Sequence, residues 1–207
     1  MAGTAKNYNA NQIVLGPSDL WLNVAVPAAS SRMTLDTDGT PDATANPNAI
    51  HLGMTAGGVT FEYVPEIQDF SSDELTAPHL SRIISERATL KGEFLQVFNW
   101  NLLEKMTVGG TKSVDTNTST GYEQLTMGGL STISTFSIAL IGPDISGTNQ
   151  WWVVQLYKTF NRAGFNFTVT RKDQSRAPFE FNGQAVTSRA AGDQIGNFWH
   201  QGAANAA

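Results

Sequence analysis

The stretch LGMTAGGVTFEYVPEIQDF, residues 52–70, decides the class of fold that the chain is expected to adopt. After Gly57-Gly58, apolar and polar residues alternate, with Val59, Phe61 and Tyr63 on one face. Such alternation predicts a β-strand with one buried face. Because glycine tolerates positive φ, the Gly-Gly pair predicts a tight turn or a bulge where the chain enters this strand.

Two neighbouring features extend this expectation. Pro65 cannot donate a ladder hydrogen bond, so the strand is expected to end near it, at the edge of a sheet. Residues 82–97 form a second extended run, and its alternating polar face is long for a strand. The region therefore predicts two successive long strands.

The rest of the chain predicts antiparallel β-structure around one helix. Further strands are expected at residues 19–26, 130–141, 150–160 and 165–171 and around Phe179 and Phe181. The run 150–160 is apolar on both faces, so it needs cover from the core on one side and from a second layer, the helix or a neighbouring subunit on the other. A helix is expected over 99–106, with an Asn cap and with Trp100, Leu103 and Met106 in the core.

Two polar stretches, 27–49 and 111–121, have no apolar period and are expected to be long loops. Strands at short intervals with a single helix predict a mainly β fold, a β-sandwich or barrel-like domain with one flanking α-helix. We expect one domain over residues 1–207, with an N-terminal arm at about 1–18 and a flexible C-terminal tail at about 199–207.

The composition excludes several classes of protein. The chain has no cysteine, which rules out disulfides, thiolate metal sites and a cysteine nucleophile. Charged residues make up 15 % of the chain, against roughly 25 % in ordinary soluble domains, which favours a surface covered by partners. A net charge of −5 without a basic cluster argues against nucleic-acid binding. The polar N-terminus predicts no signal peptide, and no stretch is apolar enough for a membrane helix.

Motifs for catalysis or metal binding are weak. The three histidines lie far apart in sequence, without ligand-spaced partners. Asp36, Asp38 and Asp42 around Gly39 match a calcium loop only in part, and Asp and Gly are also ordinary turn residues. The stretch 109–113 lacks the spacing of a phosphate-binding loop.

The carboxylates at 62, 66, 69, 73 and 74 allow two interpretations. They could include a glycosidase pair, or they could form a solvated acidic face. The second interpretation is favoured, because no nucleophile or base motif accompanies them. The sequence therefore predicts neither an enzyme nor a cofactor.

Three segments in order resemble the tail tube (major tail) proteins of long-tailed bacteriophages. The segment 52–63 with its continuation PEIQDF, residues 65–70, resembles a strand opening of that family. The run ISERATLKGEFLQVFNWNLL, residues 84–103, is similar to its strand followed by a helix, and RAPFEFNGQAVT, residues 176–187, to its closing strand. The stretches 27–49 and 107–121 do not match.

The resemblance implies a structural virion protein with a β-sandwich flanked by a helix. Copies would form six-fold rings that stack into a hollow tube, through which DNA passes without specific binding. The implied partners are further copies of the chain, the tail terminator, baseplate or tip proteins and the tape measure protein. The implied location is the phage tail, after assembly in the host cytoplasm, without membrane insertion, enzyme activity or cofactor.

The resemblance suggests roles for individual residues. Basic contacts hold DNA, so an acidic or neutral lumen would let it slide. The candidate lumen-facing acids are Glu62, Glu66, Glu86 and Glu93, and Arg87 and Lys91 on the same strand complicate this assignment. The candidate subunit-interface aromatics are Trp151 and Tyr157.

The loop 27–49 is a candidate ring-stacking loop, through Thr34, Asp36, Asp38 and Thr40. Deletion of residues 32–46 is expected to leave a folded subunit that stacks poorly. The alternative function is a β-sandwich carbohydrate-binding module, in which Trp21, Trp151 or Trp152 would stack on a sugar.

Overall fold

The computed structural model describes residues 18–70, 80–95, 99–116, 121–129, 131–144, 150–168 and 174–200. The strands are β1 (Asp19–Leu22), β2 (Ile50–His51), β3 (Thr55–Phe70), β4 (Leu80–Phe94), β5 (Thr111–Val114), β6 (Glu123–Thr126), β7 (Phe136–Pro143), β8 (Trp151–Asn161), β9 (Ala177–Gly183) and β10 (Gly196–His200), and α1 is Trp100–Met106. Eight strands form one antiparallel sheet that does not close into a barrel, which confirms the mainly β, sandwich-like fold. The expected N-terminal arm, except Ser18, and the tail after His200 lie outside the described residues.

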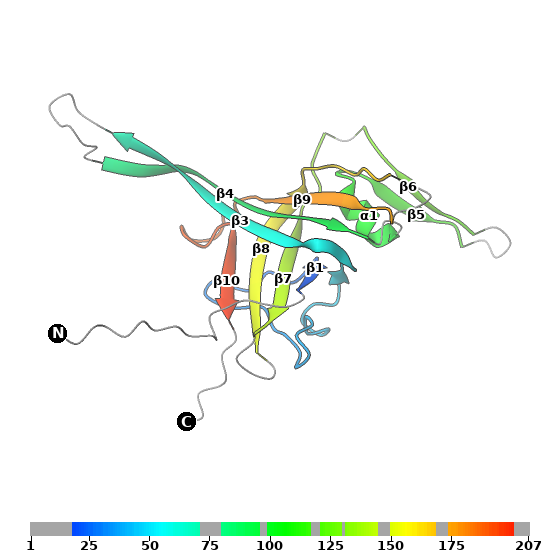
Figure 1. Cartoon of the computed structure of the whole chain (residues 1–207), viewed down its shortest axis with the longest axis horizontal. Coiled ribbons are helices and arrows are strands. Elements are labelled where there is room, and N and C mark those ends of the chain that lie inside the picture. The colour runs from blue at the N-terminus through cyan, green and yellow to red at the C-terminus, as the bar shows by residue number, and fades with distance from the viewer. Residues whose placement is uncertain are drawn as a thin grey trace.

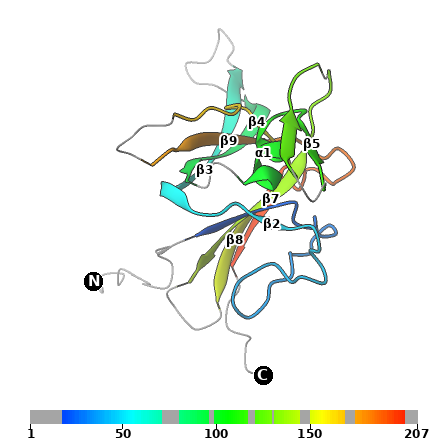
Figure 2. The ribbon, with the colours of Figure 1, turned by 90° about the vertical axis from the view of Figure 1, so that its right-hand side faces the viewer.

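The sheet divides into two layers at β8. The strands run in the order β2-β1-β7-β8-β9-β4-β3, and β10 pairs with β8 as well. On the same side of β8, residues 152–156 pair with β10 and residues 159–161 pair with β9. As a result β3, β4 and β9 run across β1, β7, β8 and β10 (Figure 1), and the two groups form upper and lower layers (Figure 2).

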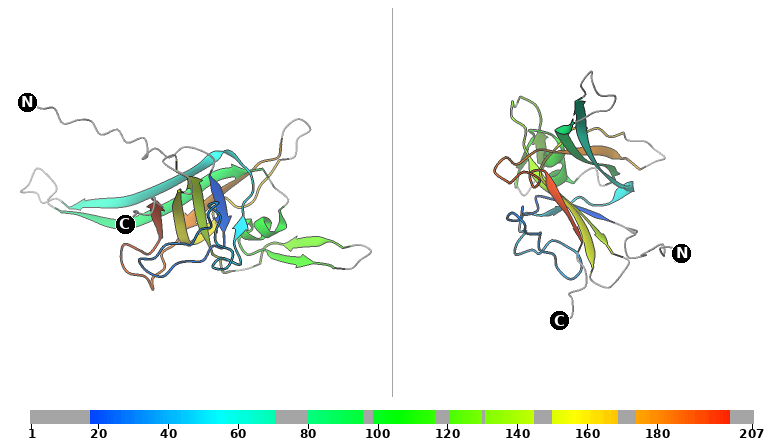
Figure 3. Two further views of the ribbon diagram at one scale, coloured as in Figure 1. Left: turned by 90° about the horizontal axis from the view of Figure 1, so that it is seen from below. Right: turned by 90° about the vertical axis from the view of Figure 1, so that its left-hand side faces the viewer.

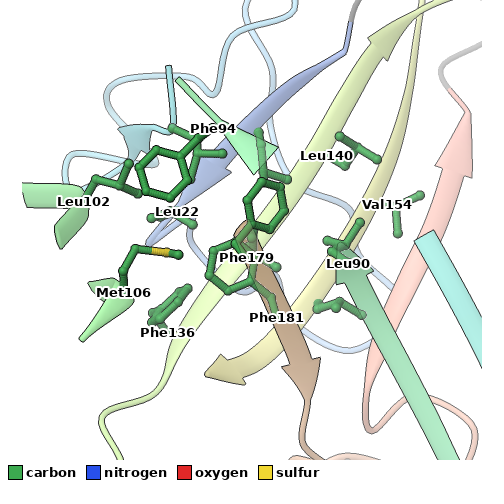
Figure 4. Packing of buried hydrophobic residues seen from close by; sticks show 14 of the residues in the cluster. Leu22, Leu90, Phe94, Leu102, Met106, Phe136, Leu140, Val154, Phe179 and Phe181 are labelled. Atoms are coloured by element: carbon green, nitrogen blue, oxygen red, sulfur yellow. The ribbon is translucent and has the colours of Figure 1, made fainter. Parts of the chain in front are cut away.

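The larger hydrophobic core lies between these layers. Val154 of β8 faces it from the lower layer, and Leu90, Phe179 and Phe181 face it from the upper layer (Figure 4). Phe179 and Phe181 stack with ring centroids 5.0 Å apart. The expected apolar face of β7 is confirmed here. We call this set the main cluster; its buried members are Leu20, Leu22, Leu52, Ala88, Leu90, Phe94, Leu102, Met106, Phe136, Ile138, Leu140, Val154, Leu156, Ala177, Phe179 and Phe181.

Helix α1 closes one end of the main cluster. The Asn99 side chain accepts a 3.3 Å hydrogen bond from the Leu102 amide, so the expected N-cap is confirmed. Leu102 and Met106 are fully buried, and Leu103 is almost so. Trp100 was expected in the core but is only half-buried. The helix therefore uses its Leu-Leu pair as the buried face.

A second cluster lies on the other face of the lower layer. It consists of Val24, Met33, Ala139, Ile141 and Val153. The segment 27–49 runs beside this face of β7 and β8 (Figure 2) and covers it with Met33 and Leu35. Both apolar faces of β8 are thus confirmed, and the chain itself supplies cover on the second face.

The segment 27–49 is therefore a part of the fold. The Asn46 side chain is buried, and its Oδ1 atom accepts a 2.8 Å hydrogen bond from the Ala25 amide. Deletion of residues 32–46 would remove Met33 and Asn46 and uncover the second cluster. The structure therefore argues against the expectation that the deleted chain would remain folded.

Several expected strands differ from the observed ones. Strand β1 ends at Leu22, because Asn23 has a left-handed backbone (φ 56°), and Val24 joins the second cluster while Leu22 stays in the main one. Residues 165–168 are not a strand; β9 occupies the place beside β8. The expected loop 111–121 instead begins with β5, which pairs with β6.

The start of β3 bears out the expected bulge. The register with β4 shifts between Ala56 and Val59, and Gly57 and Gly58 have φ of 72° and 89°. The strand does not end at Pro65 but continues to Phe70. Since β3 is the last strand of the sheet, the missing amide of Pro65 disturbs no second partner, and the expected edge position is confirmed.

We expect Gly39→Ala to destabilise the fold more than Gly192→Ala, by about 1–3 kcal/mol, because a Cβ atom at residue 39 would overpack the second cluster. Both glycines have positive φ, 84° and 87°. A Cβ atom on Gly39 would lie 2.5 Å from Cδ2 of Trp151, whereas one on Gly192 meets nothing within 4 Å. Urea unfolding followed by tryptophan fluorescence measures the difference; equal losses would contradict this packing.

Candidate assembly surfaces

The β3–β4 hairpin extends beyond the two layers. Residues 89–94 of β4 pair with β9, but residues 80–88 pair with β3 alone. We call residues 60–70 and 80–88 the arm; from Tyr63 and Ala88 outwards, its two strands pair only with each other. It projects at one end of the molecule (Figure 1), opposite the β5–β6 hairpin (Figure 3, left).

The arm exposes large apolar side chains from both strands. An isolated two-stranded ribbon is marginally stable in water, and contiguous exposed apolar surface marks an interaction site. Sequence reasoning missed this surface, because the alternation in β3 looks the same in the buried and the exposed part. The exposed side chains are Phe61, Tyr63, Val64, Ile67, Phe70, Leu80, Ile83 and Ile84.

The register gives the arm two distinct faces. Phe61 pairs with Leu90 of the main cluster and Tyr63 with Ala88, so these residues continue the core-facing side, which we call the inner face. Ile67 and its partner Ile83 lie further along the same face. The opposite, outer face carries mostly polar and charged residues.

The four candidate lumen acids are divided between these faces. Glu62, Glu66 and Glu93 lie on the outer face, whereas Glu86 is opposite Pro65 on the inner face. There Glu86 accepts a hydrogen bond from the Tyr63 hydroxyl, which raises the pKa of Tyr63. The structure thus brings three of the four acids to one surface.

The outer face is mixed in charge. The Lys91 ammonium lies 2.9 Å from Glu62 Oε2, and this hydrogen bond holds the pKa of Glu62 below its usual value. Arg176 lies 3.4 Å from Glu93, and Arg87 is opposite Val64. Glu66 accepts a 2.7 Å hydrogen bond from Ser85. The basic residues offset much of the acidic charge, so the outer face is close to neutral.

The two candidate interface aromatics are covered within their own chain. Tyr157 is 4 % exposed; its hydroxyl donates a 2.7 Å hydrogen bond to Asp193, and the Arg189 guanidinium lies 4.1 Å from its ring centroid. Burial is the first cause that raises the pKa of Tyr157 to about 12. Trp151 is half-buried against Gly39. Tyr157 therefore presents almost no free surface to a neighbour, whereas Trp151 presents part of its side chain.

The candidate stacking residues lie in a turn of the segment 27–49. Asp38 Oδ1 accepts hydrogen bonds from the Thr40 hydroxyl at 2.7 Å and the Thr40 amide at 3.1 Å, which lower the pKa of Asp38. The Asp36 amide bonds the Thr40 carbonyl at 2.8 Å, and Thr34 accepts from the amide of Asp42. The side chains of Asp36 and Asp38 are exposed. The aspartates therefore shape a turn and leave its surface open to contacts.

The described residues offer few other binding or catalytic features. Among the described residues, no group of three or more His, Asp or Glu side chains lies close enough to hold a metal ion. No helix in the described part of the chain is long and apolar enough to cross a membrane. The side chains of Trp21, Trp151 and Trp152 are half-buried and their indole nitrogens are buried, so none of the three is fully exposed for stacking on a sugar.

The chain was also compared with known proteins. No protein-family model matches the sequence, and no curated protein is significantly similar to it.

We expect Tyr157→Phe to lower the midpoint of urea unfolding at neutral pH, because it removes the hydrogen bond to Asp193. That bond lowers the pKa of Asp193, so its contribution is present above about pH 4 and is lost as the pH falls through the lowered value. The pKa of Tyr157 is raised, so the contribution is also lost as the pH rises from about 10 towards 12.

The difference in urea midpoint between the original protein and Tyr157→Phe should therefore be largest between about pH 4 and pH 10 and smaller outside this range. Tyr122→Phe is the control, because Tyr122 is 57 % exposed. A difference that stays constant from pH 3 to 11 would contradict the role given to this pair.

Proposed function

We propose that the protein is a structural subunit that assembles with copies of itself into stacked rings, as a tail tube of a long-tailed bacteriophage. In this role it acts in the virion as a conduit for DNA, beside terminator, tip and tape measure proteins. Neither enzyme activity nor a cofactor is part of the proposal. Its basis is the sequence resemblance together with the surfaces of the fold.

The arm is the observation that carries the proposal. On the inner face, Ile67 and Ile83 are 58 % and 52 % exposed, on a ribbon that no other described part of the chain covers. Burial of one such side chain contributes about 1.5–3 kcal/mol. Contact with further copies of the chain would bury these apolar side chains, and no other protein would be needed.

The outer face supports the conduit role. Basic side chains bind DNA because they neutralise phosphates and release the counterions of the backbone. A lining that is close to neutral lacks this driving force, so DNA can slide past it. The ion pair between Glu62 and Lys91 and the one between Glu93 and Arg176 occupy basic groups that would otherwise bind phosphate. We place this face towards the lumen.

The first test is negative-stain electron microscopy of the purified protein over a concentration series, with light scattering in parallel. The proposal predicts rings or tubes with a central hole, in amounts that rise with concentration. A monomer at every concentration, including in the presence of preformed tails as initiators, would overturn it.

We expect Ile67→Glu to raise the concentration needed for assembly about tenfold or more, since a buried isoleucine is worth more than the 1.4 kcal/mol of one decade. The fold should be unchanged, because an exposed substitution alters stability within about 0.5 kcal/mol. Gln68→Glu adds the same charge to the neighbouring residue on the outer face and is the control. Equal effects of the two variants on light scattering would argue against apolar docking of the inner face.

We expect Glu66→Lys to leave assembly intact and to slow DNA release from assembled particles, because it adds phosphate-binding charge to the proposed lumen. Glu66→Gln removes the acid without adding a base and should have a smaller effect. DNA release is followed by a dye that fluoresces on binding DNA, at several salt concentrations. Release at the original rate in low salt would place the outer face away from the lumen.

A further inference from the structure

A groove of about 360 Å³ opens at the base of the arm. It lies between the inner face of the β3–β4 hairpin and β10, with β8 beneath. The side chains that matter for its chemistry are Phe61, Tyr63, Ala88, Leu156, Ile195 and Phe198. The groove is thus mostly apolar, and Phe198 on its rim is 64 % exposed.

The groove exists because the two layers separate on this side. Strand β9 meets β8 at residues 159–161, and β10 meets β8 at residues 152–156. The upper layer crosses over β10 without pairing with it, so apolar side chains of both layers stay open. In the described part of the chain, β10 pairs with β8 alone.

Within one molecule, the distal end of the arm lies away from the groove. On β3 the lining of the groove ends at Tyr63, and Ile67 lies four residues further along the strand. At about 3.3 Å per residue, that is roughly 13 Å away. The distal apolar side chains and the groove are therefore two separate open surfaces on one molecule.

The charges on both surfaces permit contact between identical chains. Two copies each carry a net charge of −5, so bare carboxylates across a contact would repel. On the inner face, Glu86 accepts a hydrogen bond from Tyr63, and Asp69 accepts one from Ser81. In the groove, Gln155, Gln194 and Asn197 are neutral, and Glu86, which also lines it, is the carboxylate that Tyr63 hydrogen-bonds.

We propose that the distal inner face of the arm, around Ile67 and Ile83, docks in the groove beside Phe198 of a second copy of the chain. The inference rests on the proposed function and names the surfaces that meet. Because the arm and the groove are different surfaces, the contact is heterologous. Each copy has one arm and one groove, so the contact repeats from copy to copy until a ring closes.

The test uses the absence of cysteine from the chain. Ile67→Cys and Phe198→Cys are made separately, mixed under assembly conditions and treated with a short bismaleimide linker. Both positions are more than half exposed, so the fold should tolerate them. Val114→Cys on β5, which is 53 % exposed, replaces Ile67→Cys in the control mixture.

The inference predicts cross-links between the two variants of the mixture, several times more abundant than in the control mixture and than those of either variant alone. Cross-links of Ile67→Cys with itself would show an arm-to-arm contact and overturn the inference. Assembled particles without enriched mixed cross-links would also overturn it while the proposed function stands. A chain that stays monomeric by light scattering would overturn both.

Discussion

Strand β8 is apolar on both faces, and the need to cover both is the constraint on which the rest of the structure depends. Val154 and Leu156 point into the main cluster, and Val153 points into the second cluster. Burial of each such side chain contributes about 1.5–3 kcal/mol. A single sandwich core could cover only one of these faces. The second face requires another part of the chain, and the segment 27–49 meets this need with Met33 and Leu35.

The pairing of β8 follows from the same position. One edge pairs with β7 over nearly its full length, and the other edge is shared by β10 and β9. Sharing an edge sends β10 and β9 into different layers, and this creates the sandwich, the core between its layers and the open groove at one side. The two surfaces that we assign to assembly, the groove and the arm, thus arise from the geometry that buries β8.

Much of this fold could be predicted from the sequence, because it depends on local patterns. Alternation identified β7, a run that is apolar on both faces identified β8, and the Asn cap located α1. Features that depend on backbone conformation or distant pairing could not be predicted in this way. The left-handed Asn23 moves Val24 to another cluster, and β10 is a five-residue strand that is ordered by its pairing with β8.

The candidate site shows the same limit. Glu62, Glu86 and Glu93 were placed correctly on strands, but the face of Glu86 relative to Glu62 depends on the register between β3 and β4. A shift of one residue in that register would exchange the faces of every side chain on one strand. Tyr157 is apolar enough to suggest an interface, yet Arg189 and Asp193, more than thirty residues away, cover it.

The division of β3 and β4 into a buried base and an exposed arm separates folding from assembly. Leu90 and Phe94 at the base of β4 are fully buried, whereas Ile83 and Ile84 in the same strand are each 52 % exposed. Both clusters are complete without the apolar residues of the distal arm, so the body does not depend on them for its core. Because the body does not need the arm for its stability, the arm can carry apolar side chains that stay exposed in a single subunit. The low charge of the chain is consistent with the proposed assembly, because further charge on the inner face would oppose the burial that we propose for it.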